Sequence, residues 1–568
     1  MNLKWYLMSI IIFIGKYIHC QTCTSLNAWP IVNTNWSSCP ILSDGTLTTN
    51  NVYAECMFLT VPIDWNSNNL TTCSSTIEIF VKRYFVSGHQ NTSHHLWRIP
   101  GGGGIPISTL EFEAMSVVSA LSGSVSIYMT DKRGVGRSSL LECPKSIVAN
   151  LTNCLPFIEQ NQYRLKHNTY TNTAYDLEYV LNVIMGKNRE NIQRNQRVIL
   201  MPSSQGTYLV QRYLLVTENA EQVDAVIFDS ILPTDATILT HGDKHLNYVF
   251  LDLFGRCAQN QQDCAKYFED ENPLRALYSY KMNEDLLDQS SCLYLLNTST
   301  TELANKMSFM LYPQTMPLLP ALIFRINRCN DNDQRVLKHF LNATQPPQQD
   351  GAEGFSILVE INNNLAELWS SLDTSKGNDS SCEYLKGISM NTFASTHVMP
   401  DTYCPIQQTG RLGYPTDKFY RKYPTKKTQL PVLLLHGDMD QALPVSIPRH
   451  FAKQYSRVNS KFTYIELPRT GHTPTSASPT SDEAVICGWN LAITFIQSET
   501  FEADRSCLKK INEIDFGGKT SSTKQVAVQY FGTDDIWDVD KSSRGNTMEI
   551  TVLSYVFGII FIVIKHNE

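Results

Sequence analysis

The sequence predicts an α/β fold in which a mostly parallel, doubly wound sheet carries a large, mainly helical cap insertion. Strand-like and helix-like segments alternate between residues 52 and 233, and the pattern resumes over 428–512. Residues 234–427 interrupt it with helical stretches such as 340–344 and 357–372. Alternation of this kind is what a parallel sheet covered on both faces requires. One core with one cap accounts for most of the 568 residues.

Composition is that of a globular protein and excludes a nucleic-acid partner. Apolar residues make up 42% of the chain and charged residues 18%. The 47 lysines and arginines against 54 aspartates and glutamates give a net charge of −7, and no basic block occurs. Nucleic acid is bound by clustered positive charge, which this chain lacks.

The N-terminus has the features of a signal peptide over residues 1–20. Lys4 precedes an apolar run from Trp5 to Ile14, and a cleavage point follows Cys20. The alternative is a retained membrane anchor, although the apolar run is short for a bilayer span. Residues 21–51 would then form an N-terminal extension of an extracellular or cell-surface protein.

Cysteine usage agrees with export. Removing Cys20 from the 15 cysteines leaves 14, an even number, scattered without CxxC ligand spacing. This pattern favours disulfides over a metal site, and the sequence indicates neither a metal nor a cofactor. Asn-x-Ser/Thr sequons further predict glycosylation. The sequons lie at Asn35, Asn69, Asn91, Asn150, Asn297, Asn342 and Asn378.

The C-terminus ends in an apolar segment that predicts contact with a membrane. Residues 550–564 are apolar and follow a polar stretch, 513–549, which we interpret as a stalk. The apolar run is shorter than a usual spanning helix but fits the removable tail of a GPI signal. The charged last four residues favour a spanning helix instead, and a buried core element is the third reading.

Several predicted strands end in loops whose residues are candidates for an active site. The segments 56–65 and 76–85 are β-rich and form entry strands. The strand 95–99 runs into a loop of four glycines, Gly101 to Gly104, and the strand 125–130 ends at Asp131-Lys-Arg-Gly-Val-Gly-Arg-Ser138. Active sites of parallel sheets lie at such carboxyl ends of strands.

The strongest single motif surrounds Ser204. The strand 198–201 is followed by Pro202-Ser203-Ser204-Gln205-Gly206, and then by the helical pattern 207–215. Strand, sharp turn and helix make a nucleophile elbow, which holds a serine hydroxyl above the sheet. A Ser-x-Gly match alone also fits an ordinary turn.

The second half of the chain supplies a matching acid and base. The strand 430–435 continues into a loop with Asp438 and Asp440, and the strand 462–467 leads to His472. A lone histidine is more often structural and a loop aspartate more often caps a turn. The serine, aspartate and histidine occur in the order found in α/β-hydrolases, which favours a catalytic triad over those structural roles.

These residues suffice for acyl transfer. His472 would take the proton of Ser204, Asp440 would orient the imidazole, and Ser204 would attack a carbonyl carbon to form an acyl-enzyme. The oxyanion needs preorganised donors. The backbone N–H of Gln205 and that of Gly102 or Gly103 are the candidates.

Over about residues 52–510 the sequence resembles the proline-iminopeptidase and tripeptidyl-aminopeptidase branch of α/β-hydrolases. The likeness lies in Val61-Pro-Ile-Asp64, the glycine loop, Asp131 to Ser138, Ser204-Gln-Gly-Thr-Tyr208 and Gly471-His472. Two positions depart from that family, since Pro202 stands where glycine is usual and Gly103 where proline is frequent. Pro202 therefore puts the geometry of the elbow in question.

The resemblance implies several further features. It implies peptidase activity, Asp440 rather than Asp438 as the acid, and a disulfide between Cys487 and Cys507. It also implies a cap that binds the free amine of a peptide, for which Glu367 is a candidate; a solvated helix charge is the more common role for such a residue.

Fold and triad do not name a substrate. We therefore expect a secreted or surface-anchored serine hydrolase acting on a peptide or an ester. Carboxylesterase or lipase activity is the enzymatic alternative. A non-catalytic adhesion or binding protein with a hydrolase fold is the alternative of another class, and the sequence leaves the oligomeric state open.

Overall fold

The computed structural model describes most of the chain between residues 35 and 537. The predicted signal peptide, the apolar segment 550–564 and four of the predicted sequons, Asn69, Asn91, Asn150 and Asn378, lie outside the described residues. No helix among those described has both the length and the hydropathy of a membrane span. Within 35–537 the undescribed residues are 46–50, 67–74, 89–93, 145–150, 188, 194, 218–221, 236–238, 269–271, 283–290, 345–352, 370–381, 424–428 and 483–484.

In the described part of the chain, nine strands form one sheet in the order β1-β2-β3-β5-β4-β6-β7-β8-β9. The pairs β1–β2, β2–β3 and β3–β5 are antiparallel, and every pair from β5 to β9 is parallel. This strand order, with β4 and β5 exchanged and the antiparallel strands at one edge, is that of the α/β-hydrolase fold. The strands are β1 (Ser37–Ser38), β2 (Val52–Pro62), β3 (Thr76–Val86), β4 (His94–Ile99), β5 (Val125–Thr130), β6 (Val198–Pro202), β7 (Ala225–Asp229), β8 (Val432–Gly437) and β9 (Phe462–Leu467).

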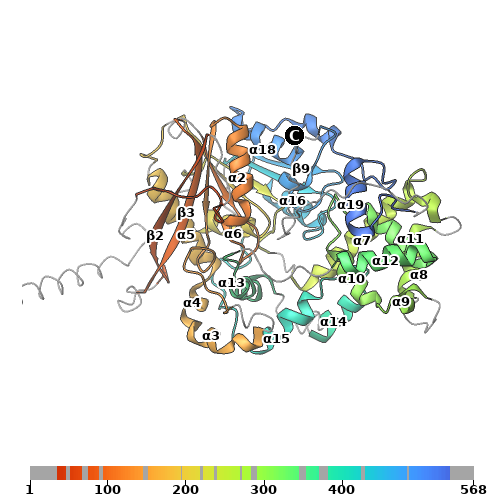
Figure 1. The fold of residues 1–568 in the computed structure, drawn as a ribbon. Coiled ribbons are helices and arrows are strands. Elements are labelled where there is room, and N and C mark those ends of the chain that lie inside the picture. The colour runs from red at the N-terminus through yellow and green to blue at the C-terminus, as the bar shows by residue number, and fades with distance from the viewer. Residues whose placement is uncertain are drawn as a thin grey trace, which may run out of the picture.

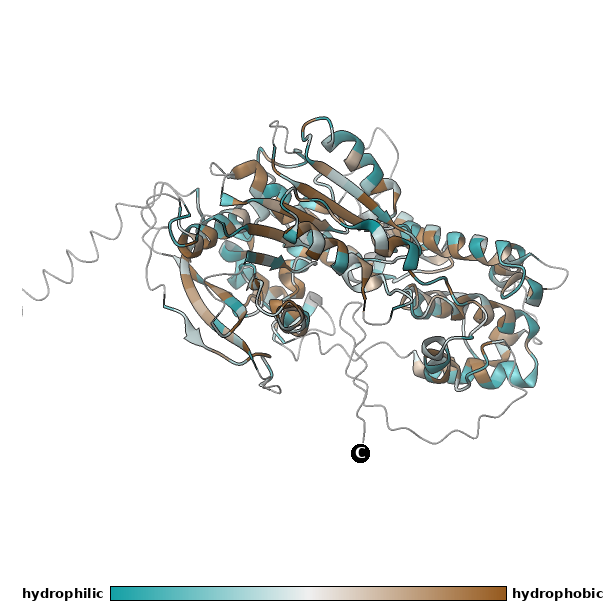
Figure 2. Cartoon of the chain, turned by 90° about the horizontal axis from the view of Figure 1, so that it is seen from above, coloured by the Kyte–Doolittle hydropathy of each residue, from teal (hydrophilic) through white to brown (hydrophobic). Residues whose placement is uncertain are grey.

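Helices cover both faces of the sheet (Figure 1). Alternate residues of one strand point to opposite faces of the sheet. Leu200 packs with residues of α5, α6 and α16 on one face. Ile199 packs with α2 and α18 on the other. The central strands are therefore apolar along their length, as their brown colour in Figure 2 shows. The core helices are α2 (Glu111–Ala120), α5 (Tyr170–Met185), α6 (Gln205–Val216), α16 (Ser446–Tyr455), α17 (Pro474–Ala477) and α18 (Cys487–Gln497).

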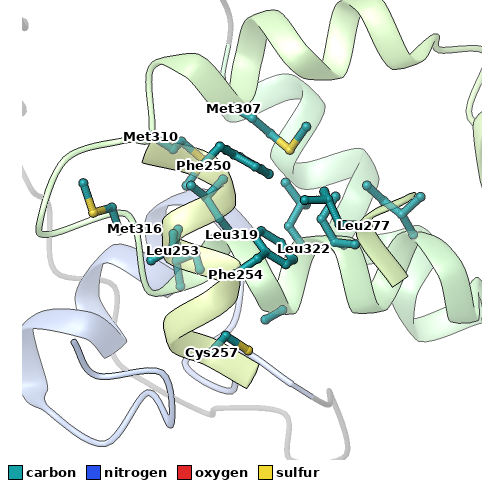
Figure 3. Packing of buried hydrophobic residues seen from close by; sticks show 14 of the residues in the cluster. Phe250, Leu253, Phe254, Cys257, Leu277, Met307, Met310, Met316, Leu319 and Leu322 are labelled. Carbon is teal, nitrogen blue, oxygen red and sulfur yellow. The ribbon is translucent and has the colours of Figure 1, made fainter. Parts of the chain in front are cut away.

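The outer part of the cap is a helical body with its own apolar core. Phe250 and Phe254 of α7 pack with Leu319 and Leu322 of α11 (Figure 3). Three methionines, Met307, Met310 and Met316, fill the gaps between these helices. The helices are α7 (Gly242–Gln259), α8 (Pro273–Met282), α9 (Cys292–Leu295), α10 (Thr300–Ser308), α11 (Leu318–Arg328) and α12 (Asp331–Ala343).

The inner part of the cap is built from two stretches of chain. Leu358 and Ile361 pack with Ile158 of α3 and Leu165 of α4, two helices in the segment between β5 and α5. The cap therefore includes helices that precede the predicted boundary at residue 234. The elements are α3 (Leu155–Gln160), α4 (Gln162–His167), α13 (Ile357–Asn363), the π-helical turn η8 (Asn364–Leu368), α14 (Cys382–Asn391), η9 (Met399–Tyr403) and α15 (Cys404–Gln408).

The predicted stalk is folded over residues 513–537. The helix α19 (Ser521–Phe531) packs on α12, and the rings of Phe340 and Phe531 are 6.4 Å apart. Trp537 is buried, stacks on Tyr267 at 4.0 Å, and donates from its indole nitrogen to the carbonyl of Phe516. The prediction of a stalk over 513–549 was therefore wrong for residues 513–537, because a few apolar side chains among many polar ones are enough to dock a segment.

Disulfide bonds cross-link segments of both the core and the cap. The pair Cys487–Cys507, which the resemblance implied, is bonded and ties α18 to the segment that follows it. Each bridge limits the unfolded chain and so stabilises the folded one. The other bonds among the described residues are Cys39–Cys56, Cys143–Cys154, Cys257–Cys264, Cys292–Cys329 and Cys382–Cys404.

The burial of Trp537 in the C-terminal segment leads to a prediction about stability. Replacing Trp537 with alanine should lower the free energy of unfolding by about 3 kcal/mol, because a large buried ring leaves a cavity. Thermal or denaturant unfolding followed by circular dichroism measures this. Val528→Ala is the matched control, since Val528 lies on α19 with 47% of its surface exposed. Equal stability of the two variants would mean that this segment is a stalk after all.

Candidate active site

Ser204 stands at a sharp turn between β6 and α6. Its backbone has φ 50° and ψ −127°, a conformation that costs energy for a residue with a side chain. The Ser204 N–H donates to the carbonyl of Asp229 at the end of β7, at 2.8 Å. A Cβ on Gly206 would come within 2.6 Å of the Pro100 carbonyl oxygen, so this position needs glycine. This is the geometry of a nucleophile elbow.

Pro202 does not disturb the turn. It is the last residue of β6 and pairs with Ile99 of β4. The bonds that hold the elbow come from the two residues after it, because Ser203 donates its N–H to the Ile99 carbonyl at 3.0 Å and Ser204 donates to Asp229. A proline lacks only its own N–H. The concern raised by the sequence therefore does not apply to the backbone of Ser204.

Asp440 and His472 meet at the same edge of the sheet. They follow β8 and β9, and the His472 Nδ1 lies 2.9 and 2.8 Å from the two carboxylate oxygens of Asp440. Ser230, just after β7, donates its hydroxyl to Asp440 at 2.8 Å and accepts the N–H of Thr473 at 2.9 Å. Sequence reasoning missed Ser230, because the strand that precedes it, β7, was not among the predicted strands.

The surroundings of Asp440 favour its charged form. Burial alone would raise the pKa of Asp440, but attraction to His472 and His436 and the hydrogen bonds that it accepts outweigh burial and lower it. The N–H groups of Ala442 and Leu443 donate to one carboxylate oxygen at 2.9 and 2.8 Å. For His472, burial would lower the pKa, whereas Asp440 and Asp229 raise it above its ordinary value. A carboxylate so placed can stabilise an imidazolium.

Asp438 has a different set of partners. Its carboxylate accepts from Arg256 of the cap helix α7 at 3.1 Å and from the N–H of Thr470 at 3.3 Å. Asp438 therefore joins the acid loop to the cap and to the loop before His472. The contact with His472 belongs to Asp440, in line with what the resemblance implied.

The glycine loop passes next to Ser204. A Cβ on Gly101 would lie 2.9 Å from the Ser204 Cβ, and one on Gly103 would lie 3.4 Å from the side-chain nitrogen of Gln205. Gln205 is the first residue of α6, and its side chain donates to Asn364 of the cap at 2.6 Å. Gln205 and Gly101 thus lie beside the candidate nucleophile, while Gly102 and Gly103 follow in the same loop and lie close to Glu360 of the cap. The role of Gly102, Gly103 and Gln205 as oxyanion donors stays a prediction.

Glu367 is neither a solvated charge nor available to a substrate. The residue is 2% exposed, and its carboxylate accepts from Arg212 at 2.9 Å and from the Tyr208 hydroxyl at 2.6 Å. Arg212 and Tyr208 both lie on α6, so this pair fastens the cap to the helix that follows the nucleophile. A carboxylate with internal partners of this kind is structural, and the assignment of Glu367 as an amine anchor was wrong.

Glu360 is the cap carboxylate nearest the glycine loop, and sequence reasoning missed it. Its Oε2 accepts the N–H of Gly104 at 2.7 Å, and a Cβ on Gly102 or Gly103 would lie 3.3 Å from the same oxygen. Its Oε1 accepts from Asn364 at 2.7 Å. The only available signal was a second acidic residue, two helical turns before Glu367 in the same predicted helix.

Comparisons with known proteins add little to this geometry. No family model matches the sequence, and no curated protein matches it. Among solved structures, lipase A from Candida antarctica has a TM-score of 0.33 at 10% identity, covering 88% of this chain and 90% of that one. An esterase from Exiguobacterium antarcticum has a TM-score of 0.31 at 11% identity, covering 74% and 96%. An epoxide hydrolase from Vigna radiata has a TM-score of 0.27 at 10% identity, covering 74% and 92%. We base the fold on strand order and pairing.

The two aspartates of the acid loop give a matched pair of variants. Asp440→Asn should lower kcat by about 10⁴-fold, because His472 loses the carboxylate that fixes its tautomer. Asp438→Asn should leave kcat within about tenfold of the wild type, since Asp438 contacts Arg256 and not His472. Steady-state kinetics on one hydrolysable substrate compares them. A larger loss from Asp438→Asn would exchange the two roles.

Proposed function

We propose that this protein is an exported serine hydrolase that cleaves peptides through Ser204, His472 and Asp440. One observation carries the proposal: a strained serine, a histidine and a buried carboxylate follow β6, β9 and β8 at a single edge of the sheet. In this arrangement His472 removes the proton of Ser204, the oxygen of Ser204 attacks the carbonyl carbon, and His472 then protonates the leaving amine. Water hydrolyses the acyl-enzyme in the second half of the cycle.

The substrate that we favour is a peptide with a free amino terminus. Glu360 supports this choice, because its carboxylate borders the glycine loop and has hydrogen-bonding partners but no ion-pair partner within 4 Å among the described residues. An ammonium group bound there would satisfy the charge and bring the first residues of a peptide close to Ser204. The cap that carries Glu360 would restrict the site to chain ends.

Export is supported by the disulfide bonds and by the exposed sequons. Disulfides in both the core and the cap are typical of oxidising compartments. The described sequons, Asn35, Asn297 and Asn342, are exposed and thus accessible to glycosylation. The apolar segment 550–564 would hold the mature protein at a membrane with the catalytic domain outside, as a spanning helix or as a GPI signal.

A covalent probe tests the chemistry before any substrate is known. The wild-type ectodomain should react with a fluorophosphonate, and Ser204→Ala should lose labelling and hydrolysis while it keeps the melting temperature of the wild type. Ser203→Ala is the control and should keep its labelling. Ser203 carries the adjacent hydroxyl, which donates to Asp229 at 2.9 Å. Labelling that persists in Ser204→Ala, or an unreactive wild type, would favour a binding protein.

A substrate panel then tests the peptide proposal. Aminoacyl and tripeptidyl amides should be cleaved, and acetylation of their amino terminus should lower kcat/KM by about 10- to 100-fold, the value of a hydrogen bond to a charged group. Glu360→Gln keeps an oxygen acceptor for Gly104 but loses the charge. It should lower kcat/KM for free-amine substrates, mainly through KM, and leave acetylated substrates unchanged.

The exposed cap residue Glu353 supplies the control, since Glu353→Gln removes the same charge from the neighbouring segment. An equal effect of the two variants would mean that Glu360 acts only through the overall negative charge of the cap and not by binding the amine. Faster cleavage of simple esters than of every amide would assign the protein to the esterases.

A further inference from the structure

The loop expected to bind the oxyanion consists of glycines. Gly101 to Gly104 form its tip, and Gly102 has a positive φ of 62°. Glycine peptides rotate more freely than any others. Catalysis nevertheless requires N–H donors that already point at the oxyanion. Something outside the loop must therefore fix the orientation of its peptide groups.

Lys132 contacts the peptide groups in question. It follows β5, is 6% exposed, and donates from Nζ to the carbonyl oxygens of Gly101, at 3.4 Å, and of Gly102. A trans peptide is planar, and its C=O and N–H point in opposite directions. Holding the carbonyls of Gly101 and Gly102 toward Lys132 therefore turns the N–H groups of Gly102 and Gly103 the other way.

We propose that Lys132 is the positioning residue of the oxyanion loop, which aims the N–H groups of Gly102 and Gly103 by binding the carbonyls of the same peptide units. This inference rests on the proposed function of Ser204. The ammonium group also polarises both peptide units, since a cation at the C=O end makes the N–H end a stronger donor. Lys132 itself touches neither the nucleophile nor the base.

The cap holds the other end of the loop. Glu360 accepts the N–H of Gly104, so the glycines run between a core ammonium and a cap carboxylate. The backbone around Lys132 is held by Asp131, whose carboxylate oxygens accept the N–H of Ile107 at 2.8 Å and that of Arg137 at 2.9 Å. The clamp is therefore built on a fixed base and does not depend on a freely moving lysine.

The charge of Lys132 makes the clamp sensitive to pH. Burial lowers the pKa of Lys132 to about 8, although attraction to Glu360 of the cap and to the adjacent Asp131 acts in the opposite direction. Above that pH the amine keeps only two N–H groups and loses its charge, so kcat should fall. On the acid side, protonation of His472 limits the rate, and the raised pKa of His472 places that limb above its ordinary value of 6.5.

Lys132→Met tests the clamp by removing the donor while it keeps the length of the side chain. It should lower kcat by about 100-fold, comparable to the loss of one oxyanion donor, and change KM by less than about threefold. Lys306→Met is a matched control. Lys306 is also buried, at 5% exposed, and also donates to two carbonyls, those of Leu341 at 3.1 Å and Thr344 at 3.0 Å, but within the outer cap. A kcat for Lys132→Met within twofold of the control would overturn the inference.

Lys132→Arg provides a second test that does not depend on the stability of the methionine variant. A guanidinium stays charged at every pH at which the protein folds, so the fall of kcat near pH 8 should disappear. An alkaline limb that stays near pH 8 in Lys132→Arg would overturn the role of Lys132. Amide hydrogen exchange over residues 100–104, compared in the Ser204→Ala background, should be faster with Lys132→Met and unchanged with Lys306→Met.

The outcomes separate this inference from the proposed function. A wild type that reacts with fluorophosphonate and hydrolyses substrates, together with an equally active Lys132→Met, overturns only the role of Lys132. A wild type that neither reacts nor hydrolyses overturns both. Loss of kcat with unchanged KM, together with faster exchange in the loop, supports both.

Discussion

The buried carboxylate of Asp440 is the interaction on which the candidate site depends. It accepts hydrogen bonds from Ser230 after β7, from its own loop after β8, and from His472 after β9. Because β7 also receives the N–H of Ser204, the same carboxylate is linked to the elbow after β6. The ends of β7, β8 and β9 are thus held together by a single charged group, and the backbone of Asp229 extends the connection to the elbow after β6. Removing it would leave His472 and Ser230 without their common acceptor, so position and charge are lost together.

The local features of the fold and site could be predicted from the sequence because each motif is continuous. The elbow around Ser204, the acid loop and the His472 loop each follow an apolar strand, and a parallel sheet brings such ends together. The sheet order confirms the predicted fold class. The resemblance directed the choice between Asp438 and Asp440, which spacing alone left open. The contact that distinguishes them, between Arg256 and Asp438, joins residues far apart in the chain.

Features that depend on contacts between distant segments could not be predicted. Glu367 and Glu360 look alike in sequence, but one meets Arg212 of α6 and the other meets the glycine loop. Their roles follow from how the cap helix is rotated over the core, and helical periodicity does not specify that rotation. The fold of the segment 513–537 could not be predicted for the same reason, since its burial depends on the apolar core that the cap helices form. Composition averages over such a segment and hides its few anchoring residues.

The cap meets the candidate site through charged groups, and each contact reaches a different element. Glu367 binds Arg212 behind the nucleophile, Arg256 binds Asp438 in the acid loop, and Glu360 binds the glycine loop. The first pair is fully buried, and a buried pair contributes more to geometry than to net stability. The pair between Arg256 and Asp438 is partly exposed and holds the cap only weakly. Glu360 combines both properties, since it orders the loop through one hydrogen bond and keeps a charge that a substrate can use. Under the proposed function the cap would both position the glycine loop and select the substrate, so a change in the cap would alter specificity and catalysis together.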